Sequence, residues 1–150
     1  RSSDLNNTEQ SKIHTVQKGE LIMLQDDYIL RQIREMVRAV MKMLFNVNAP
    51  ELTPDVIEDA EARTVLENLL SLLEDGSIDE AENQLYEMTC DGDRQNLEIG
   101  LIFYYILNAK SDEFLEENNF SREEIMTGIQ DLADRYNLSG IAEAFRTDVL

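Results

Sequence analysis

The sequence predicts an all-α protein, an antiparallel array of six to seven helices in a single domain. Apolar residues recur at intervals of three and four along most of the chain, which is the spacing of one helix face. Residues that cap or stop helices separate these segments, and no stretch shows the period-2 alternation of a strand. A chain of 150 residues can bury a core without disulfides or a metal ion.

Residues 1–22 differ in composition from the rest and predict a flexible leader outside the helical domain, which we assign to residues 23–150. The peptide Lys18-Gly-Glu can be encoded by a purine-rich string that resembles a bacterial ribosome-binding site just before Met23. Two hypotheses follow. The leader is translated upstream DNA or a cloning remnant, with Met23 as the natural start, or it is a genuine tail. It contains the single histidine, His14.

The first helix is expected to begin near Asp26 or Asp27, where a carboxylate can cap free N–H groups, and to end at Asn46–Asn48. Its main apolar face comprises Ile29, Ile33, Met36, Val37, Val40 and Leu44. Leu30, Met41, Met43 and Phe45 lie off that face. A helix with this many apolar residues is expected to bury a second face, either in its own domain or on a partner.

Thr53 and Pro54 predict a restart of helix, because threonine is a good N-cap and proline suits the first helical position. A longer helix follows from about Ala60 to Glu74, and Gly76 ends it. Its inward residues are expected to be Val65, Leu66, Leu69, Leu70, Leu72 and Leu73.

Two further helices are predicted by their N-terminal capping residues. Ser77 with Glu80 forms a capping-box pattern for a helix that ends near Thr89. Asp93 can cap a very apolar helix that ends near Ala109. In that helix Gly100 favours close packing against a neighbour, and Tyr104 and Tyr105 diverge by about 100° and so serve packing rather than one pocket.

The C-terminal third is expected to contain a short helix and two longer ones. Ser111 can cap the short helix, and Ser121 with Glu124 forms a second capping box for a helix that reaches Tyr136. A final helix is marked by Ile141, Ala142 and Phe145.

The segment Leu72-Leu-Glu-Asp-Gly-Ser-Ile-Asp-Glu-Ala81 resembles the turn of a tetratricopeptide helical hairpin, in which glycine breaks the first helix and a small residue lets the pair pack closely. The sequence departs from that pattern at Leu69, where the family has a small residue. From Met23 onward the chain is similar to a family of short acidic bacterial proteins of uncharacterised function. Three segments carry that resemblance: DDYILRQIREMVRAVMKMLF, GSIDEAENQLYE and NNFSREEI. It implies a cytoplasmic helical protein and indicates neither an activity nor a site.

The net charge of −18 disfavours nonspecific binding to nucleic acid or to an anionic membrane, since both need positive potential. The longest apolar run, Leu101–Leu107, is far shorter than a membrane span. Cys90, the single cysteine, lies beside Asp91 and Asp93, which oppose thiolate formation. The Asp-Gly segments lack the spacing of a calcium loop, and no nucleotide or zinc motif is present. We therefore expect no enzyme activity and no cofactor.

The first predicted helix, from about Asp26 to Asn46, carries four of the few basic residues along one band, opposite its main apolar face. These residues are Arg31, Arg34, Arg38 and Lys42. The band fits a solvated face, a surface that docks on the acidic side of a second copy, or a site for an acidic partner. We favour a non-catalytic protein–protein interaction module, with a protein partner or a homo-oligomer. The alternatives are a carboxylate-based metal-binding protein or enzyme, and an acidic decoy for a basic partner.

Overall fold

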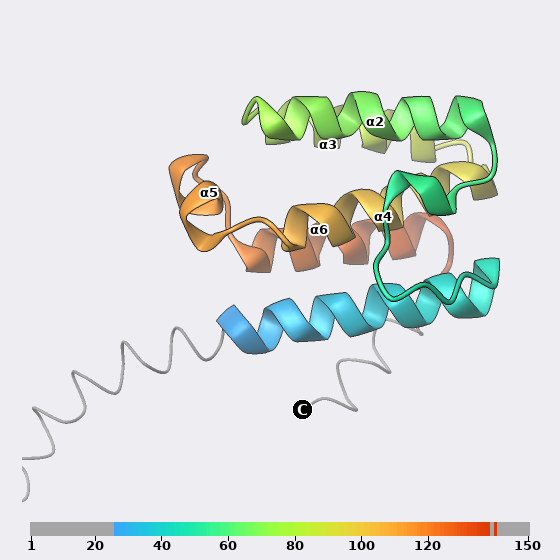
Figure 1. The fold of residues 1–150 in the computed structure, drawn as a ribbon, viewed down its shortest axis with the longest axis horizontal. Coiled ribbons are helices and arrows are strands. Elements are labelled where there is room, and N and C mark those ends of the chain that lie inside the picture. Colours follow the sequence, from blue (N-terminus) through green and yellow to red (C-terminus); the bar gives the residue numbers. More distant parts are fainter. Residues whose placement is uncertain (1–25, 139, 141–150) are drawn as a thin grey trace, which may run out of the picture.

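The structure is a computed structural model, and residues 26–138 and 140 are described. Every regular element in this part is helical, as predicted (Figure 1). The elements in order are helix 26–45, the 3₁₀ turn η1 (Pro54–Val56), α2 (Ala60–Glu74), α3 (Ile78–Thr89), α4 (Arg94–Asn108), α5 (Asp112–Glu117) and α6 (Arg122–Arg135). The leader and the final helix expected around Ile141, Ala142 and Phe145 lie outside the described residues.

The helices stack in layers around α4. In Figure 1, α2 and α3 form a hairpin on one side, α4 and α6 lie in the middle, and helix 26–45 runs along the other side. The short α5 covers one end of the stack. Helix 26–45 is tied to the middle layer by Asn108, whose side chain donates to the Leu30 carbonyl at 2.9 Å. Neighbouring helices are antiparallel, as the short connections require.

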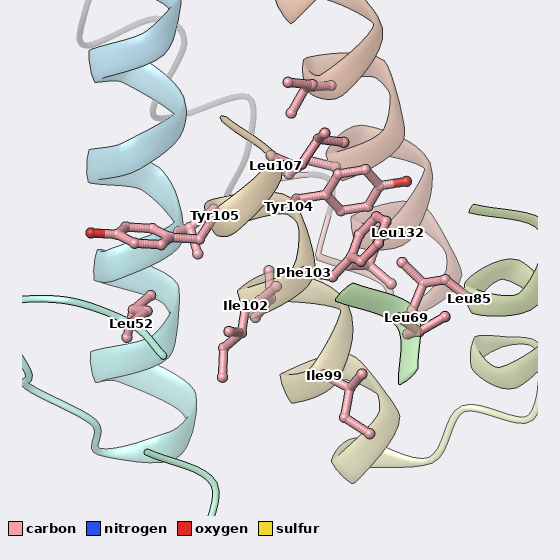
Figure 2. Close-up of a cluster of buried hydrophobic side chains, with 14 of the residues drawn as sticks. Leu52, Leu69, Leu85, Ile99, Ile102, Phe103, Tyr104, Tyr105, Leu107 and Leu132 are labelled. Carbon is pink, nitrogen blue, oxygen red and sulfur yellow. The ribbon is translucent and has the colours of Figure 1, made fainter. Parts of the chain in front are cut away.

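The central position of α4 follows from its composition, since it is apolar on nearly every side. A helix of this kind is stable in water only when its neighbours cover all of its faces. Its largest buried residues are fully enclosed, with Ile102, Phe103 and Leu107 at 0% exposure. The two adjacent tyrosines leave α4 in different directions, as predicted: Tyr105 points toward helix 26–45 and Tyr104 toward α6 (Figure 2).

Gly100 lets α4 approach its neighbours closely, as the sequence indicated. A Cβ atom at this position would lie 2.9 Å from Leu132 Cδ2 in α6 and 3.4 Å from Leu85 Cδ1 in α3. The absent side chain therefore lets leucines of two helices occupy the same small region of the core.

Four helices end by one mechanism, in which a residue with positive φ reverses the chain. These residues are Asn46 (φ 58°), Gly76 (φ 82°), Asn119 (φ 58°) and Asn137 (φ 59°). After Gly76, Asn119 and Asn137 the next residue donates its backbone N–H to a carbonyl five residues earlier, as Ser77 does to Leu72 at 2.8 Å. After Asn46 the reach is six residues, from Val47 to the Met41 carbonyl at 3.2 Å. Asparagine and glycine are the residues that tolerate this conformation best. The stop signals at Asn46 and Gly76 are therefore confirmed.

The N-terminal caps match the sequence at three helices and differ at two other places. Asp93, Ser111 and Ser121 accept backbone N–H groups through their side chains, as predicted. Ser77 occupies the N-cap position of α3 but its side chain makes no capping hydrogen bond, so the expected capping box at Ser77 and Glu80 was wrong.

The segment after Thr53 also differs from expectation. It forms only the single 3₁₀ turn η1, and the Thr53 side chain makes no capping bond. A new helix, α2, then starts after Asp59, whose carboxylate accepts from the Glu61 N–H at 3.3 Å. Because Ile57 is 1% exposed, this short turn brings an apolar side chain into the core before α2 begins.

Two predictions about apolar faces need correction. Val65 is 36% exposed, so it lies on the outer side of α2, where Ala62 takes an inward position instead. On helix 26–45, Met41 is fully buried and belongs to the main core, whereas Met43 is 58% exposed. The off-face apolar residues therefore do not form one continuous second face.

Candidate docking site

The predicted basic residues lie on the side of helix 26–45 that faces away from the core. Ile33 and Val37, on the opposite side, are fully buried. Arg31 and Lys42 are exposed, and Arg34 and Arg38 are half-buried. One helix thus presents both an apolar face to the bundle and a positive face outward, as a 3.6-residue period requires.

Arg34 is part of a hydrogen-bonded link to α4. Its Nη2 lies 3.1 Å from Glu51 Oε1, and the Tyr105 hydroxyl donates to Glu51 Oε2 at 2.8 Å. Burial and this bond to a carboxylate raise the pKa of Tyr105 above its ordinary value. The link holds the connection after helix 26–45 against the bundle, so Arg34 has a structural role that its position in the sequence did not indicate.

Arg38 has a looser partner. Its Nη1 lies 3.9 Å from Glu35 Oε1, one turn earlier on the same helix. At this distance, and with both side chains in contact with solvent, such a pair contributes less than about 1 kcal/mol. Arg38 therefore keeps a guanidinium group that another carboxylate can engage.

Arg31 and Lys42 differ from the other basic residues of the described chain. Neither has a hydrogen bond or an ion pair with any described residue. The remaining basic side chains outside this helix bond to other parts of the fold; they are Arg63, Arg94, Lys110, Arg122 and Arg135.

A hollow of about 230 Å³ opens between this face and the connection that follows the helix. The helix contributes Glu35, Arg38, Ala39 and Lys42, and the connection contributes Val47, Asn48, Ala49 and Leu52. The chain reversal at Asn46 turns the connection back along the helix, and the buried Leu52 anchors it to the core. The hollow thus brings together two predicted site residues, Arg38 and Lys42, and leaves Arg31 and Arg34 outside.

Two carboxyls elsewhere, the half-buried Glu82 and the buried Glu98, each accept a hydrogen bond from one neighbouring side chain. Glu82 accepts from the Tyr104 hydroxyl at 2.7 Å, and Glu98 accepts from the Gln95 side chain at 2.6 Å. Burial raises the pKa of both carboxyls. In the described part of the chain, no three Asp, Glu, His or Cys side chains are placed to hold a metal ion.

Comparison with known protein families finds a match over most of the chain. The model of one protein family matches residues 23–137. The chain belongs to this family, DUF6483, a family of unknown function. No curated protein and no solved structure matches the chain. Among the described helices, none combines the length and apolar character needed to cross a membrane.

Proposed function

We propose that the protein is a non-catalytic protein–protein interaction module that docks its partner on the outward face of helix 26–45. The supporting observation is the contrast among its basic residues. Lys42 and Arg31 have no partner within the described chain, whereas the basic residues of the other helices are used in internal contacts. Unpaired cations grouped on one face of an acidic protein favour an acidic segment of another protein.

The partner is either another protein or a second copy of this chain. The net charge of −18 gives every copy many exposed carboxylates that could meet this face. The same charge repels a polyanion at long range, which disfavours nucleic acid. We assign the module to the cytoplasm of a bacterium, as the resemblance of the sequence implies.

The α2–α3 hairpin supports a second element of the proposal, a packing unit related to a tetratricopeptide hairpin. Gly76 ends the first helix with positive φ, and Ala81 is fully buried at the start of the second. A small buried residue at this position lets two helices approach closely. The hairpin supplies the scaffold on which the docking helix is mounted, through α4.

Two full-length variants with equal net charge test the proposal. The first replaces Arg31, Arg38 and Lys42 by glutamine and keeps Arg34, because Arg34 holds the connection through Glu51. The control adds the same negative charge at exposed positions of α2 and α3, through Asn68→Asp, Asn83→Asp and Gln84→Glu.

Both variants and the wild type would serve as bait in bacterial lysate, with light scattering to report self-association. We expect the wild type and the control to retain the same partner, or the same oligomer, and the first variant to lose it. Equal capture and equal mass for all three folded proteins would refute the proposal.

A further inference from the structure

The hollow beside helix 26–45 differs from a simple positive surface, because its lining contains a carboxylate as well as two cations. Its charged wall consists of Glu35, Arg38 and Lys42, all from the helix. The opposite wall is the connection 47–52, which contributes no charge to the lining. Two cations and one carboxylate give the lining a formal charge of about +1, which matches one monoanion.

The cations in the hollow are available to a ligand. Lys42 has no partner within the described chain, and the pair between Arg38 and Glu35 is long, at 3.9 Å. An arriving carboxylate could therefore bind Lys42 directly and draw Arg38 away from Glu35 at little cost. Arginine suits this role because its planar guanidinium can give a carboxylate two parallel hydrogen bonds.

Size and charge together select the ligand. A hollow of about 230 Å³ accepts an amino-acid side chain, and the connection lines it with the uncharged residues Val47, Asn48, Ala49 and Leu52. A phosphate dianion would meet Glu35 in the wall and the excess negative charge of the whole molecule. A carboxylate carries half that charge and meets less repulsion.

We infer that this hollow binds the side-chain carboxylate of a single Asp or Glu presented by the partner protein. The inference rests on the proposed docking function and names its recognition element. A side-chain carboxylate is favoured over the carboxylate of a chain terminus, because the positive charge of the hollow comes from side chains on a helix face. Free chain termini are more often captured by clusters of backbone N–H groups.

Glu35 then acts as a specificity residue. It competes with the ligand for Arg38 and lowers the charge of the hollow. Glu35→Gln should therefore tighten carboxylate binding several-fold and admit inorganic phosphate, which the wild type should bind more weakly than a carboxylate. A gain of binding on removal of one carboxylate cannot arise from loss of folding.

The test is a titration of the ¹⁵N-labelled full chain at low salt, followed by amide chemical shifts. The probe is N-acetyl-glutamate α-amide, which carries one side-chain carboxylate. Its matched controls are N-acetyl-glutamine amide, which has no charge, N-acetyl-glycine, which presents a terminal carboxylate, and inorganic phosphate. Saturable shifts at Lys42 and at residues 47–49 are expected with the glutamate probe, and weaker ones with the three controls.

Two variants with the same charge change complete the design. Lys42→Gln should weaken binding of the glutamate probe about 2- to 5-fold, the range of one exposed ion pair. Asn68→Asp, on the exposed side of α2, should leave it unchanged. Absence of saturable shifts, equal binding of the glutamine probe, preference of the wild type for phosphate or the terminal carboxylate, or equal effects of the two variants would overturn the inference.

The probe titration and the lysate experiment can fail independently of each other. If the lysate experiment shows partner capture that depends on the basic face but the probe does not bind, only the carboxylate site is wrong. If the probe binds as expected and no protein is captured, the hollow is a site for a small carboxylate and the docking function is wrong.

Discussion

Gly128 provides a sharp test of the packing between α4 and α6. A Cβ atom at this position would lie 2.4 Å from Tyr104 Oη, 2.6 Å from Cζ and 2.7 Å from Cε1. The ring cannot yield easily, because Tyr104 is 3% exposed and packs edge-on against Phe103 with ring centroids 5.1 Å apart. Its hydroxyl is also bonded to Glu82 at 2.7 Å. We therefore expect Gly128→Ala to lower the free energy of unfolding.

The size of the effect is the difference between two opposing contributions. Overpacking of a close-packed core costs about 1–3 kcal/mol, and the short contacts with a fixed ring put Gly128→Ala in the upper half of that range. Replacing glycine by alanine within a helix stabilises the helix by about 1 kcal/mol. The net loss should be about 1–2 kcal/mol, or about 4–8 °C in Tm for a domain of this size.

Gly100→Ala is the matched control, since it makes the same change in a buried helix interior. Its Cβ would meet the methyl ends of Leu132 at 2.9 Å and 3.3 Å, and a leucine side chain can rotate. We expect a loss of less than about 1 kcal/mol, because the helix-propensity gain offsets the crowding. Guanidinium unfolding of both variants measures the difference. If Gly128→Ala is as stable as the wild type, or Gly100→Ala loses more, the reasoning about the tyrosine ring is wrong.

Three other substitutions test the charged contacts. Burial raises the pKa of Glu82, so the folded protein binds this proton more tightly than the unfolded chain. Protonation of Glu82 therefore stabilises the folded state at low pH, and this stabilisation is lost as the pH rises through the pKa of Glu82 in the folded protein. Glu82→Gln should thus be more stable than the wild type at pH 7, with the gap closing below pH ~4 in urea unfolding. Arg122→Leu should cost about 1–3 kcal/mol in the same assay, because it leaves backbone carbonyls unpaired while Asp112 remains solvated; no loss would contradict this. Glu51→Gln should cost less than about 1 kcal/mol, because its pair with Arg34 is largely exposed; a larger loss would show that the link does more than hold the connection.

Local signals in the sequence predicted most of the helix boundaries. Asp93 and Ser121 are caps whose side chains need only the next few backbone N–H groups, so their effect is decided within one turn. Gly76 stops α2 for an equally local reason, its positive φ. Ser77 fits the same local pattern but makes no capping bond, and its backbone ψ of 59° lies outside the extended conformation of the caps Asp93 and Ser121.

The candidate site was predictable only in part, because half of it comes from a connection without periodicity. The spacing of Arg38 and Lys42 placed them on one face of a helix. Nothing in the sequence indicated that residues 47–52 would lie along that face and form a hollow. The bond between Arg34 and Glu51 joins residues 17 apart, and it depends on the path of the chain after Asn46. Such contacts follow from tertiary structure and leave no periodic signal.

The distribution of positive charge is the main support for the proposed docking face. In a chain with this excess of carboxylates, a cation stabilises most where it joins two elements that would otherwise repel each other. Arg135 donates to Thr89 and so connects α6 to α3, and Lys110 pairs with Glu74 and so connects the end of α4 to α2. Lys42 joins no described elements, yet it lies at a hollow whose other cation is only loosely paired. The connection folds back because Asn46 reverses the chain and Leu52 is anchored in the core, so the two weakly engaged cations, and not the path of the connection, support the proposed docking site.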